Sequence, residues 1–197
     1  MVFTCRILNN CLHVQVRFTL SQSGTLSVSA SPTPKLASAS KDPTAATFFK
    51  ADTDSGKQYG TIFDVRIDTE PTPASKFTAT KTTHRKHYDA ARARAGIPSL
   101  PSPDLTSEVI IFNTDRCITE GSVSNIAFYD ATSGYWYTPR SSTGCLPGVL
   151  RRWLLEQRRI RETKADSDFR PEDLVTGTWV LIMNSVLGCR VGKIQRG

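Results

Sequence analysis

The sequence predicts a mixed fold of α-helices and β-strands, because segments with the two corresponding hydrophobic periods follow one another along the chain. Apolar and polar residues alternate over residues 12–18 and again from residue 26, with a Ser-Gly turn at residues 23–24 between them, as in a β-hairpin. Residues 108–113 form a short apolar run typical of a strand. Residues 149–157 form an amphipathic helix that opens with Leu-Pro-Gly. The 197 residues are enough for one domain, or for one domain and part of another.

The remaining elements follow from the same patterns. A second helix, rich in alanine and charge, ends where glycine and proline stop it. Further strands are rich in β-branched and aromatic residues, and we expect those between residues 108 and 137 to form a meander. The predicted helix is 84–95, and the predicted strands are 61–67, 123–129, 135–137 and 179–183, the last of them the final strand of the chain.

Two stretches have the composition of connections. Residues 31–46 are rich in Pro, Ser and Ala, and residues 68–81 carry two prolines among small polar residues, as interdomain linkers do. We therefore expect an amino-terminal unit over residues 1–70, a linker over 71–80 and a carboxy-terminal unit over 81–197.

The net charge of +7 raises the question of a nucleic-acid partner. Much of the charge falls in two segments, residues 81–94 and 151–161, which read as helices with partly solvated charged faces. No zinc-finger spacing, RNA-binding aromatic motif or helix-turn-helix accompanies them. We therefore expect no nucleic-acid partner.

The sequence also predicts a cytoplasmic protein that does not cross a membrane. No apolar stretch approaches the ~20 residues of a membrane-spanning helix, and the first residues lack the pattern of a secretory signal. The odd, scattered set of cysteines suggests neither a disulfide framework nor a metal site, so we expect reduced, mostly packed thiols. The cysteines are Cys5, Cys11, Cys117, Cys145 and Cys189.

A candidate phosphate site lies at the start of the helix over residues 149–157. The backbone N–H groups of Val149 and Leu150 are free there, and such a helix start attracts phosphate. Many helices begin with Pro-Gly and bind nothing, so the motif is informative only through its companions. These are Lys-Thr-Thr-His-Arg at residues 81–85, Glu-Gly-Ser-Val-Ser-Asn at 120–125, Tyr-Thr-Pro at 137–139 and Met-Asn-Ser-Val-Leu-Gly at 183–188.

This ordered set resembles the class IV aminotransferase-like enzymes, which use pyridoxal 5'-phosphate (PLP) and have fold type IV. The resemblance covers residues 77–193 and is greatest to fungal aminodeoxychorismate lyase-like proteins. It implies an α/β (α+β) fold, with a mixed, barrel-like sheet in the carboxy-terminal domain. It also implies that the earlier residues are the remnant of a smaller α+β domain whose larger part the chain lacks.

The resemblance assigns a role to five residues. Lys81 forms the Schiff base with PLP and then moves the proton, which requires a pKa lowered by cationic neighbours and partial desolvation. Glu120 faces the pyridine nitrogen and keeps it protonated. Val149 and Leu150 bind the phosphate through backbone N–H groups and Ser185 through its hydroxyl. The ordinary alternatives are a surface lysine, an exposed hairpin carboxylate and a turn serine.

Three functions remain open. Branched-chain aminotransferases of this family tend to have Asn-Tyr where Arg85 and Lys86 stand here, which favours the lyases. The first hypothesis is therefore elimination of pyruvate from 4-amino-4-deoxychorismate, giving the folate precursor 4-aminobenzoate. The others are a class IV transaminase acting on an amino acid or amine, and a non-catalytic homologue that lacks the amino-terminal half. The resemblance further implies a small-molecule substrate and a homodimer, with no metal.

Overall fold

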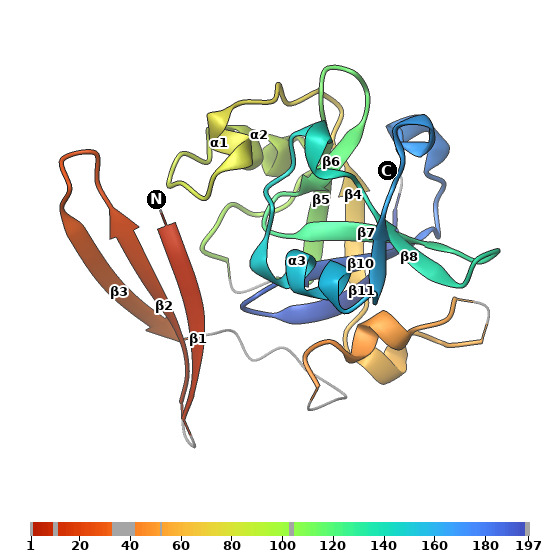
Figure 1. Ribbon diagram of the computed structural model, residues 1–197, viewed down its shortest axis with the longest axis horizontal. Coiled ribbons are helices and arrows are strands. Elements are labelled where there is room, and N and C mark those ends of the chain that lie inside the picture. Colours follow the sequence, from red (N-terminus) through yellow and green to blue (C-terminus); the bar gives the residue numbers. More distant parts are fainter. Residues whose placement is uncertain (1, 10–11, 33–41, 52, 103–104, 196–197) are drawn as a thin grey trace.

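The computed structural model describes residues 2–9, 12–32, 42–51, 53–102 and 105–195, and its strands form two sheets (Figure 1). The smaller sheet is antiparallel in the order β1-β2-β3, with β1 at Val2–Asn9, β2 at Leu12–Leu20 and β3 at Leu26–Pro32. Gly24 makes the turn between β2 and β3 with φ of 83°, a conformation that glycine adopts without steric cost. The predicted hairpin is confirmed. Part of the predicted connection over residues 31–46 lies outside the described residues.

The larger sheet has eight strands in the order β6-β5-β4-β11-β10-β7-β8-β9. It is mixed, because β4 is parallel to β5 and β11, and β8 is parallel to β9, while the other neighbours are antiparallel. Its strands are β4 (Phe63–Ile67), β5 (Ser107–Phe112), β6 (Ile118–Gly121), β7 (Asn125–Asp130), β8 (Tyr135–Thr138), β9 (Ile160–Glu162), β10 (Trp179–Asn184) and β11 (Gly188–Ile194).

Most strands of the larger sheet are buried on both faces. In β10, Val180 and Ile182 pack in one hydrophobic cluster while Leu181 packs in another, because successive side chains of a strand point to opposite faces. Likewise, Ile110 of β5 joins the first cluster, whereas Val109 packs against helix α2. This two-sided burial explains why these strands are nearly continuous apolar runs in the sequence.

The described residues include three α-helices, of which α2 and α3 contact the larger sheet, and the two helices predicted from the sequence are confirmed. The three are α1 (Lys76–Ala79), α2 (Lys86–Arg94) and α3 (Val149–Glu156). Short 3-10 turns cover Ala45–Phe48, Lys57–Tyr59, Ser141–Thr143, Ala165–Ser167 and Pro171–Asp173. None of the helices among the described residues is long and apolar enough to cross a membrane.

Two expectations about strands are wrong. The segments over residues 108–137 form no simple meander, because β5 pairs with β4 and β6, while β7 pairs with β10 and β8. The strand at residues 179–183 is also not the last one, since β11 follows it and lies between β10 and β4. Strand β11 contains two glycines and two cationic residues, so its composition did not indicate a buried strand.

The expected division near residue 70 stays a prediction, and one strand bears on it. Strand β4 precedes residue 70, yet it pairs with β5 and β11 inside the larger sheet.

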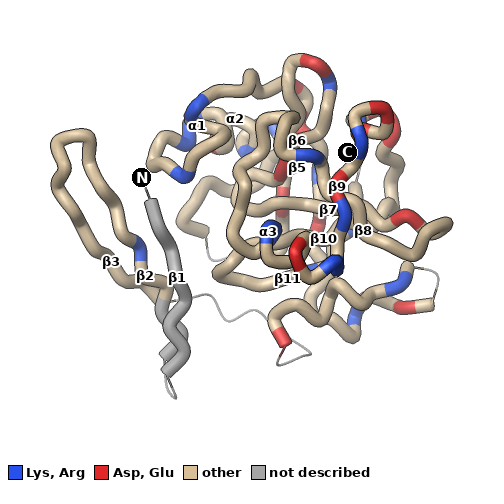
Figure 2. Tube along the Cα trace, in the orientation of Figure 1, with Lys and Arg blue, Asp and Glu red and all other residues tan. Residues whose placement is uncertain are grey.

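Basic and acidic residues are interspersed over the part of the protein that contains the larger sheet (Figure 2). Both basic segments contain paired cations, since Arg94 binds Asp68 at 2.7 Å and Arg151 binds Glu162 at 2.5 Å.

We expect Gly192→Ala to lower the free energy of unfolding by about 1–3 kcal/mol, because close packing leaves no room for a methyl group between β11 and β4. An added Cβ would lie 2.6 Å from Val65 Cγ2 and 3.0 Å from the Phe63 carbonyl oxygen. Urea denaturation measures the change. The control is Val175→Ala, because Val175 is 62% exposed and its truncation should change stability by less than about 0.5 kcal/mol. Equal stabilities of the two variants would contradict the packing argument.

Candidate functional site

The carboxyl group of Glu120 lies at the centre of the candidate site, buried on strand β6 with 3% of the residue exposed. The hydroxyl of Tyr88 donates to its Oε1 at 2.6 Å. On the other oxygen, the Leu146 backbone N–H donates to Oε2 at 3.1 Å and Asn125 Nδ2 lies at 3.4 Å. Glu120 is therefore not the exposed hairpin carboxylate of the ordinary alternative. Groups from α2, β7 and the loop before α3 converge on it.

Burial raises the pKa of Glu120 to about 7, because removing a carboxylate from water penalises its charged form. The hydrogen bonds from Tyr88 and Leu146 and the positive charge of Lys81 oppose this increase, while the negative charge of Glu108 adds to it. At neutral pH the group is thus divided between its acid and carboxylate forms. A carboxyl group in that condition can take up or release a proton.

Lys81 lies between α1 and α2 within electrostatic reach of Glu120. The residue is exposed to solvent by area, yet enough protein surrounds its ammonium group that desolvation is the main cause of a lowered pKa. The cations of Arg85 and Arg17 lower it further, and Glu120 acts in the opposite direction. Desolvation and a cationic neighbour are the two causes that the sequence led us to expect, and Arg17 of β2 is a contributor that the sequence did not indicate.

A second buried carboxylate supports strand β6. Glu108 of β5 is 1% exposed and accepts hydrogen bonds from the Ser122 backbone N–H at 2.9 Å and hydroxyl at 2.6 Å. It also accepts from the Ser124 hydroxyl. A Cβ on Gly121 would lie 2.8 Å from the Glu108 carboxyl carbon, so glycine is required after Glu120. These contacts fix the turn that follows Glu120.

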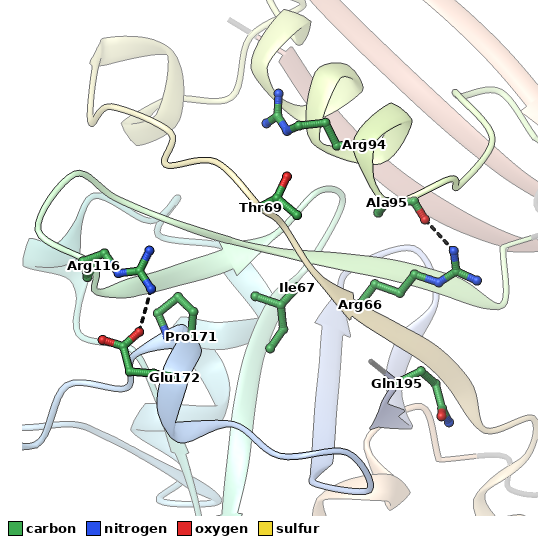
Figure 3. A pocket seen from close by; sticks show the side chains of 9 residues that line it. All are labelled: Arg66, Ile67, Thr69, Arg94, Ala95, Arg116, Pro171, Glu172 and Gln195. Carbon is green, nitrogen blue, oxygen red and sulfur yellow. Dashed lines mark hydrogen bonds and ion pairs between the residues drawn. The ribbon is translucent and has the colours of Figure 1, made fainter. Parts of the chain in front are cut away.

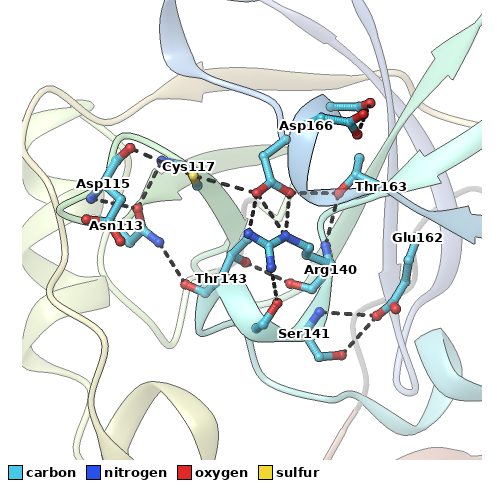
Figure 4. Close-up of polar contacts among 12 residues, drawn as sticks. Asn113, Asp115, Cys117, Arg140, Ser141, Thr143, Glu162, Thr163 and Asp166 are labelled. Carbon is cyan, nitrogen blue, oxygen red and sulfur yellow. Dashed lines mark hydrogen bonds and ion pairs between the residues drawn. The ribbon is translucent and has the colours of Figure 1, made fainter.

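Polar contacts also fix the loop that leads to α3 (Figure 4). Arg140 forms a pair with Asp168 at 2.8 Å, and its backbone N–H donates to the Thr163 hydroxyl at 3.3 Å. The backbone N–H and hydroxyl of Ser141 donate to Glu162 Oε1 at 3.1 and 3.0 Å. These contacts therefore fix the position of the loop before the turn at Leu146 and Gly148.

Helix α3 begins at Val149, with Gly148 as its N-cap and no side chain capping it. The first backbone N–H groups of a helix lack partners within the helix, which leaves those of Val149 and Leu150 available to an anion. Asn125 Nδ2 donates to the Leu146 carbonyl at 2.8 Å, and an added Cβ on Gly148 would collide with Asn125 Oδ1. Asn125 thus joins the start of α3 to Glu120.

Ser185 lies on the exposed turn between β10 and β11. Met183, near the end of β10, pairs in register with Asn125, the first residue of β7. Asn125 in turn binds the loop before α3 through the Leu146 carbonyl. The neighbouring Asn184 accepts the backbone N–H groups of Val186 and Leu187 at 3.0 and 2.8 Å, which is the local capping role that its position allows.

The structure adds three residues that the sequence analysis did not place in the site. Tyr88 donates to Glu120 from 32 positions away, Asn125 joins Glu120 to Leu146, and Glu108 supports the turn after Glu120. Asn125 stood within the Glu-Gly-Ser-Val-Ser-Asn motif, so its role was open to sequence reasoning. Tyr88 and Glu108 carry no local signal, since their partners lie on other elements.

A separate cavity lies outside this arrangement. This cavity of about 520 Å³ is lined by residues including Arg66, Arg94 and Arg116 (Figure 3), and none of the residues predicted for the site lines it.

Among the described cysteines, Cys117, Cys145 and Cys189 are free and buried, as expected. Burial raises the pKa of Cys145 to about 11, so this thiol stays protonated beside the site.

Comparison with known proteins places the chain in a family. The family model for amino-transferase class IV matches residues 7–194. The chain belongs to this class IV aminotransferase family. It is 36% identical over 143 residues to the aminodeoxychorismate lyase of Saccharomyces cerevisiae, a match that covers 68% of this chain and 37% of that protein. It is 30% identical over 121 residues to the "Putative aminodeoxychorismate lyase" of Schizosaccharomyces pombe, covering 60% of this chain and 49% of that protein.

Solved structures of the family share the fold. The "Putative amino-acid aminotransferase" of Mesorhizobium loti superposes with a TM-score of 0.67 at 24% identity, covering 95% of this chain and 75% of that one. The predicted α+β fold with a mixed, barrel-like sheet is confirmed, and the family is one of PLP-dependent enzymes. In contrast, the chain spans only about a third to a half of the length of its two curated relatives.

Glu120 should make the stability of the protein without cofactor depend on pH. The pKa of Glu120 in the folded protein, about 7, exceeds the ordinary value of 4.5. Between pH 4.5 and pH 7 the carboxyl group is therefore protonated in the folded state and ionised in the unfolded state. The resulting stability is complete below pH 4.5 and is lost as pH rises to about 7. At about 1.4 kcal/mol per pH unit, this loss is about 3 kcal/mol relative to Glu120→Gln. Urea denaturation from pH 4.5 to 8 measures it, and parallel stability curves for the two proteins would contradict the assignment.

Proposed function

We propose that this protein is a PLP-dependent lyase similar to aminodeoxychorismate lyase, which eliminates pyruvate from 4-amino-4-deoxychorismate. The arrangement of Lys81 and buried Glu120 beside the start of α3 supports the proposal. These groups are complementary to the aldehyde, ring nitrogen and phosphate of PLP. An amine with a lowered pKa matches the aldehyde, a buried carboxyl matches the nitrogen, and unpaired backbone N–H groups match the phosphate.

Each of these residues has a distinct task in the proposed reaction. When bound, PLP supplies an electron sink for the carbanion formed at the substrate carbon. Lys81 would hold the cofactor through its side-chain amine, and as a neutral amine it would take and return the proton at the substrate carbon. Glu120 holds a proton on the ring nitrogen, while Val149 and Leu150 bind the phosphate through N–H groups and Ser185 through its hydroxyl.

A lyase is preferred over the second candidate, a class IV transaminase. The relative from Saccharomyces cerevisiae is named a lyase and matches with 36% identity. Arg85 also favours the lyases, because branched-chain aminotransferases of the family tend to have Asn at this position, four residues after the lysine. Its guanidinium donates to the Ser122 carbonyl at 2.8 Å and lies over the Tyr88 ring at 5.0 Å. The structural likeness to the "Putative amino-acid aminotransferase" of Mesorhizobium loti, at 24% identity, concerns the fold and is compatible with either reaction. A homodimer and a non-catalytic homologue remain further proposals.

Covalent attachment of PLP at Lys81 tests the cofactor assignment. We expect the protein to give a visible absorption band on titration with PLP, and borohydride reduction to fix the cofactor on the peptide that contains Lys81. Lys81→Ala should abolish both signals, whereas Lys86→Ala, an exposed lysine of the same segment, should retain them. Absence of the band in the unaltered protein would refute both enzyme proposals and leave the non-catalytic one.

Product analysis then separates the two reactions. With PLP and aminodeoxychorismate, the lyase should release equal amounts of pyruvate and 4-aminobenzoate, and Lys81→Ala should release neither. Transfer of an amino group from an amino acid to a keto acid, without pyruvate release from aminodeoxychorismate, would instead establish the transaminase.

The phosphate assignment predicts the effect of a methyl group at Gly148. Its backbone, with φ of −61°, is open to alanine, so Gly148→Ala acts through the collision with Asn125 that displaces the start of α3. We expect the protein to bind PLP more tightly than pyridoxal, which has no phosphate, and the variant to lose about tenfold of this preference, equivalent to about 1.4 kcal/mol. Fluorescence titration measures both affinities. Val175→Ala, at a position that is 62% exposed, should keep the preference.

A further inference from the structure

We propose that Tyr88 is a positioning residue that orients the Glu120 carboxyl toward the cofactor ring nitrogen and stabilises its carboxylate form. This inference rests on the proposed function for the role of the cofactor, but the hydrogen bond between Tyr88 and Glu120 involves only residues of this chain. The comparisons assign no role to this tyrosine.

The hydrogen bonds leave one part of the carboxyl group open. Oε2 of Glu120 faces the Leu146 N–H and the amide of Asn125, whereas Oε1 is bound by the Tyr88 hydroxyl, at 2.6 Å. A carboxylate oxygen has two lone pairs, so Oε1 keeps one for a further donor such as a protonated ring nitrogen. Tyr88 and Leu146 hold opposite oxygens and thereby fix the plane of the carboxyl group.

Tyr88 is a donor that does not itself titrate near neutrality. It is 8% exposed, and burial together with the charge of Glu120 raises the pKa of its phenol, so the hydroxyl keeps its proton. The Arg85 guanidinium over its ring acts in the opposite direction on that pKa. The ring of the preceding residue, His87, packs beside it at a centroid distance of 3.9 Å, tilted by 45°.

The groups that face Glu120 have opposing effects on its charge. Desolvation and the Glu108 carboxylate favour the neutral acid, whereas the hydrogen bonds from Tyr88 and Leu146 and the charge of Lys81 favour the carboxylate. The Cys145 thiol nearby stays neutral because burial raises its pKa to about 11. After desolvation, the hydrogen bond from Tyr88 has the largest effect on the pKa of Glu120. Its loss should therefore move Glu120 toward the neutral acid. A neutral acid cannot hold a proton on the ring nitrogen by charge.

The decisive variant is Tyr88→Phe, which removes one hydroxyl and keeps the ring. We expect the pKa of Glu120 to rise by about one unit in the protein without cofactor, measured by carbon NMR titration of labelled glutamate carboxyl groups. The matched control is Tyr59→Phe, because the Tyr59 hydroxyl also donates to a carboxylate, Asp54, at 2.9 Å. That control should leave Glu120 unchanged. An unaltered Glu120 pKa in Tyr88→Phe, or an equal change in both variants, would overturn the inference.

A second substitution tests the same hydrogen bond in the opposite direction. Replacing tyrosine by 3-fluorotyrosine makes the phenol more acidic and a stronger donor with little change in shape, so the pKa of Glu120 should fall. Placing the fluorinated residue only at position 88 isolates the effect, and placing it only at position 59 is the control. A rise or no change at Glu120 would contradict the role of Tyr88 even if Tyr88→Phe folds poorly.

Cofactor binding separates this inference from the proposed function. In the PLP-bound protein, the acidic limb of the absorption-band pH profile should move upward in Tyr88→Phe by the amount found for Glu120. A band whose profile stays in place would contradict the positioning role while leaving the cofactor assignment intact. If the unaltered protein forms no band, the proposed function fails, and the NMR titration still decides whether Tyr88 controls Glu120.

Discussion

Burial of the Glu120 carboxyl group is the constraint on which the arrangement of the site depends. Among the described residues, no cation lies within 4 Å to form an ion pair with it, so hydrogen bonds must offset its desolvation. The donors come from Tyr88 of α2 and from Leu146 before α3, with Asn125 of β7 beside them. One carboxyl group therefore joins segments that are far apart in the sequence. Displacement of any of these segments would leave a buried polar group without its partner.

This constraint also explains why the proposed lysine and phosphate regions are close. Tyr88 follows Lys81 by seven positions, so its hydrogen bond holds the segment that carries the lysine against β6. Leu146 precedes Val149 by three positions, so its hydrogen bond holds the start of α3 against the same group. The close approach of Gly148 to Asn125 fixes the orientation of that start. The lysine, the carboxyl and the free N–H groups are thus positioned by one connected set of contacts.

Local patterns in the sequence were sufficient for part of this structure. The hairpin of β2 and β3, strands β5, β7, β8 and β10, and helices α2 and α3 follow from hydrophobic period and from turn or cap residues. Strand β6 was missed because glutamate and glycine are depleted in strands, and Glu120 and Gly121 contact Tyr88 and Glu108 on other elements. Its pairing with β5 also shifts register between Ile111 and Phe112, which no local pattern indicates.

The two buried carboxylates of the site differ in the number of hydrogen-bond donors around them, and this difference separates a structural role from a chemical one. Glu108 accepts from both the N–H and hydroxyl of Ser122, from the Ser124 hydroxyl and from the Val109 N–H at 2.9 Å. These bonds occupy most of the roughly four lone-pair positions of a carboxylate, so Glu108 has little capacity for a ligand. Glu120 has two close donors, with the Asn125 amide at 3.4 Å, and keeps an open position on Oε1. Of two carboxylates buried on adjacent strands, only Glu120 therefore combines burial with the capacity to bind and exchange a proton with a further group.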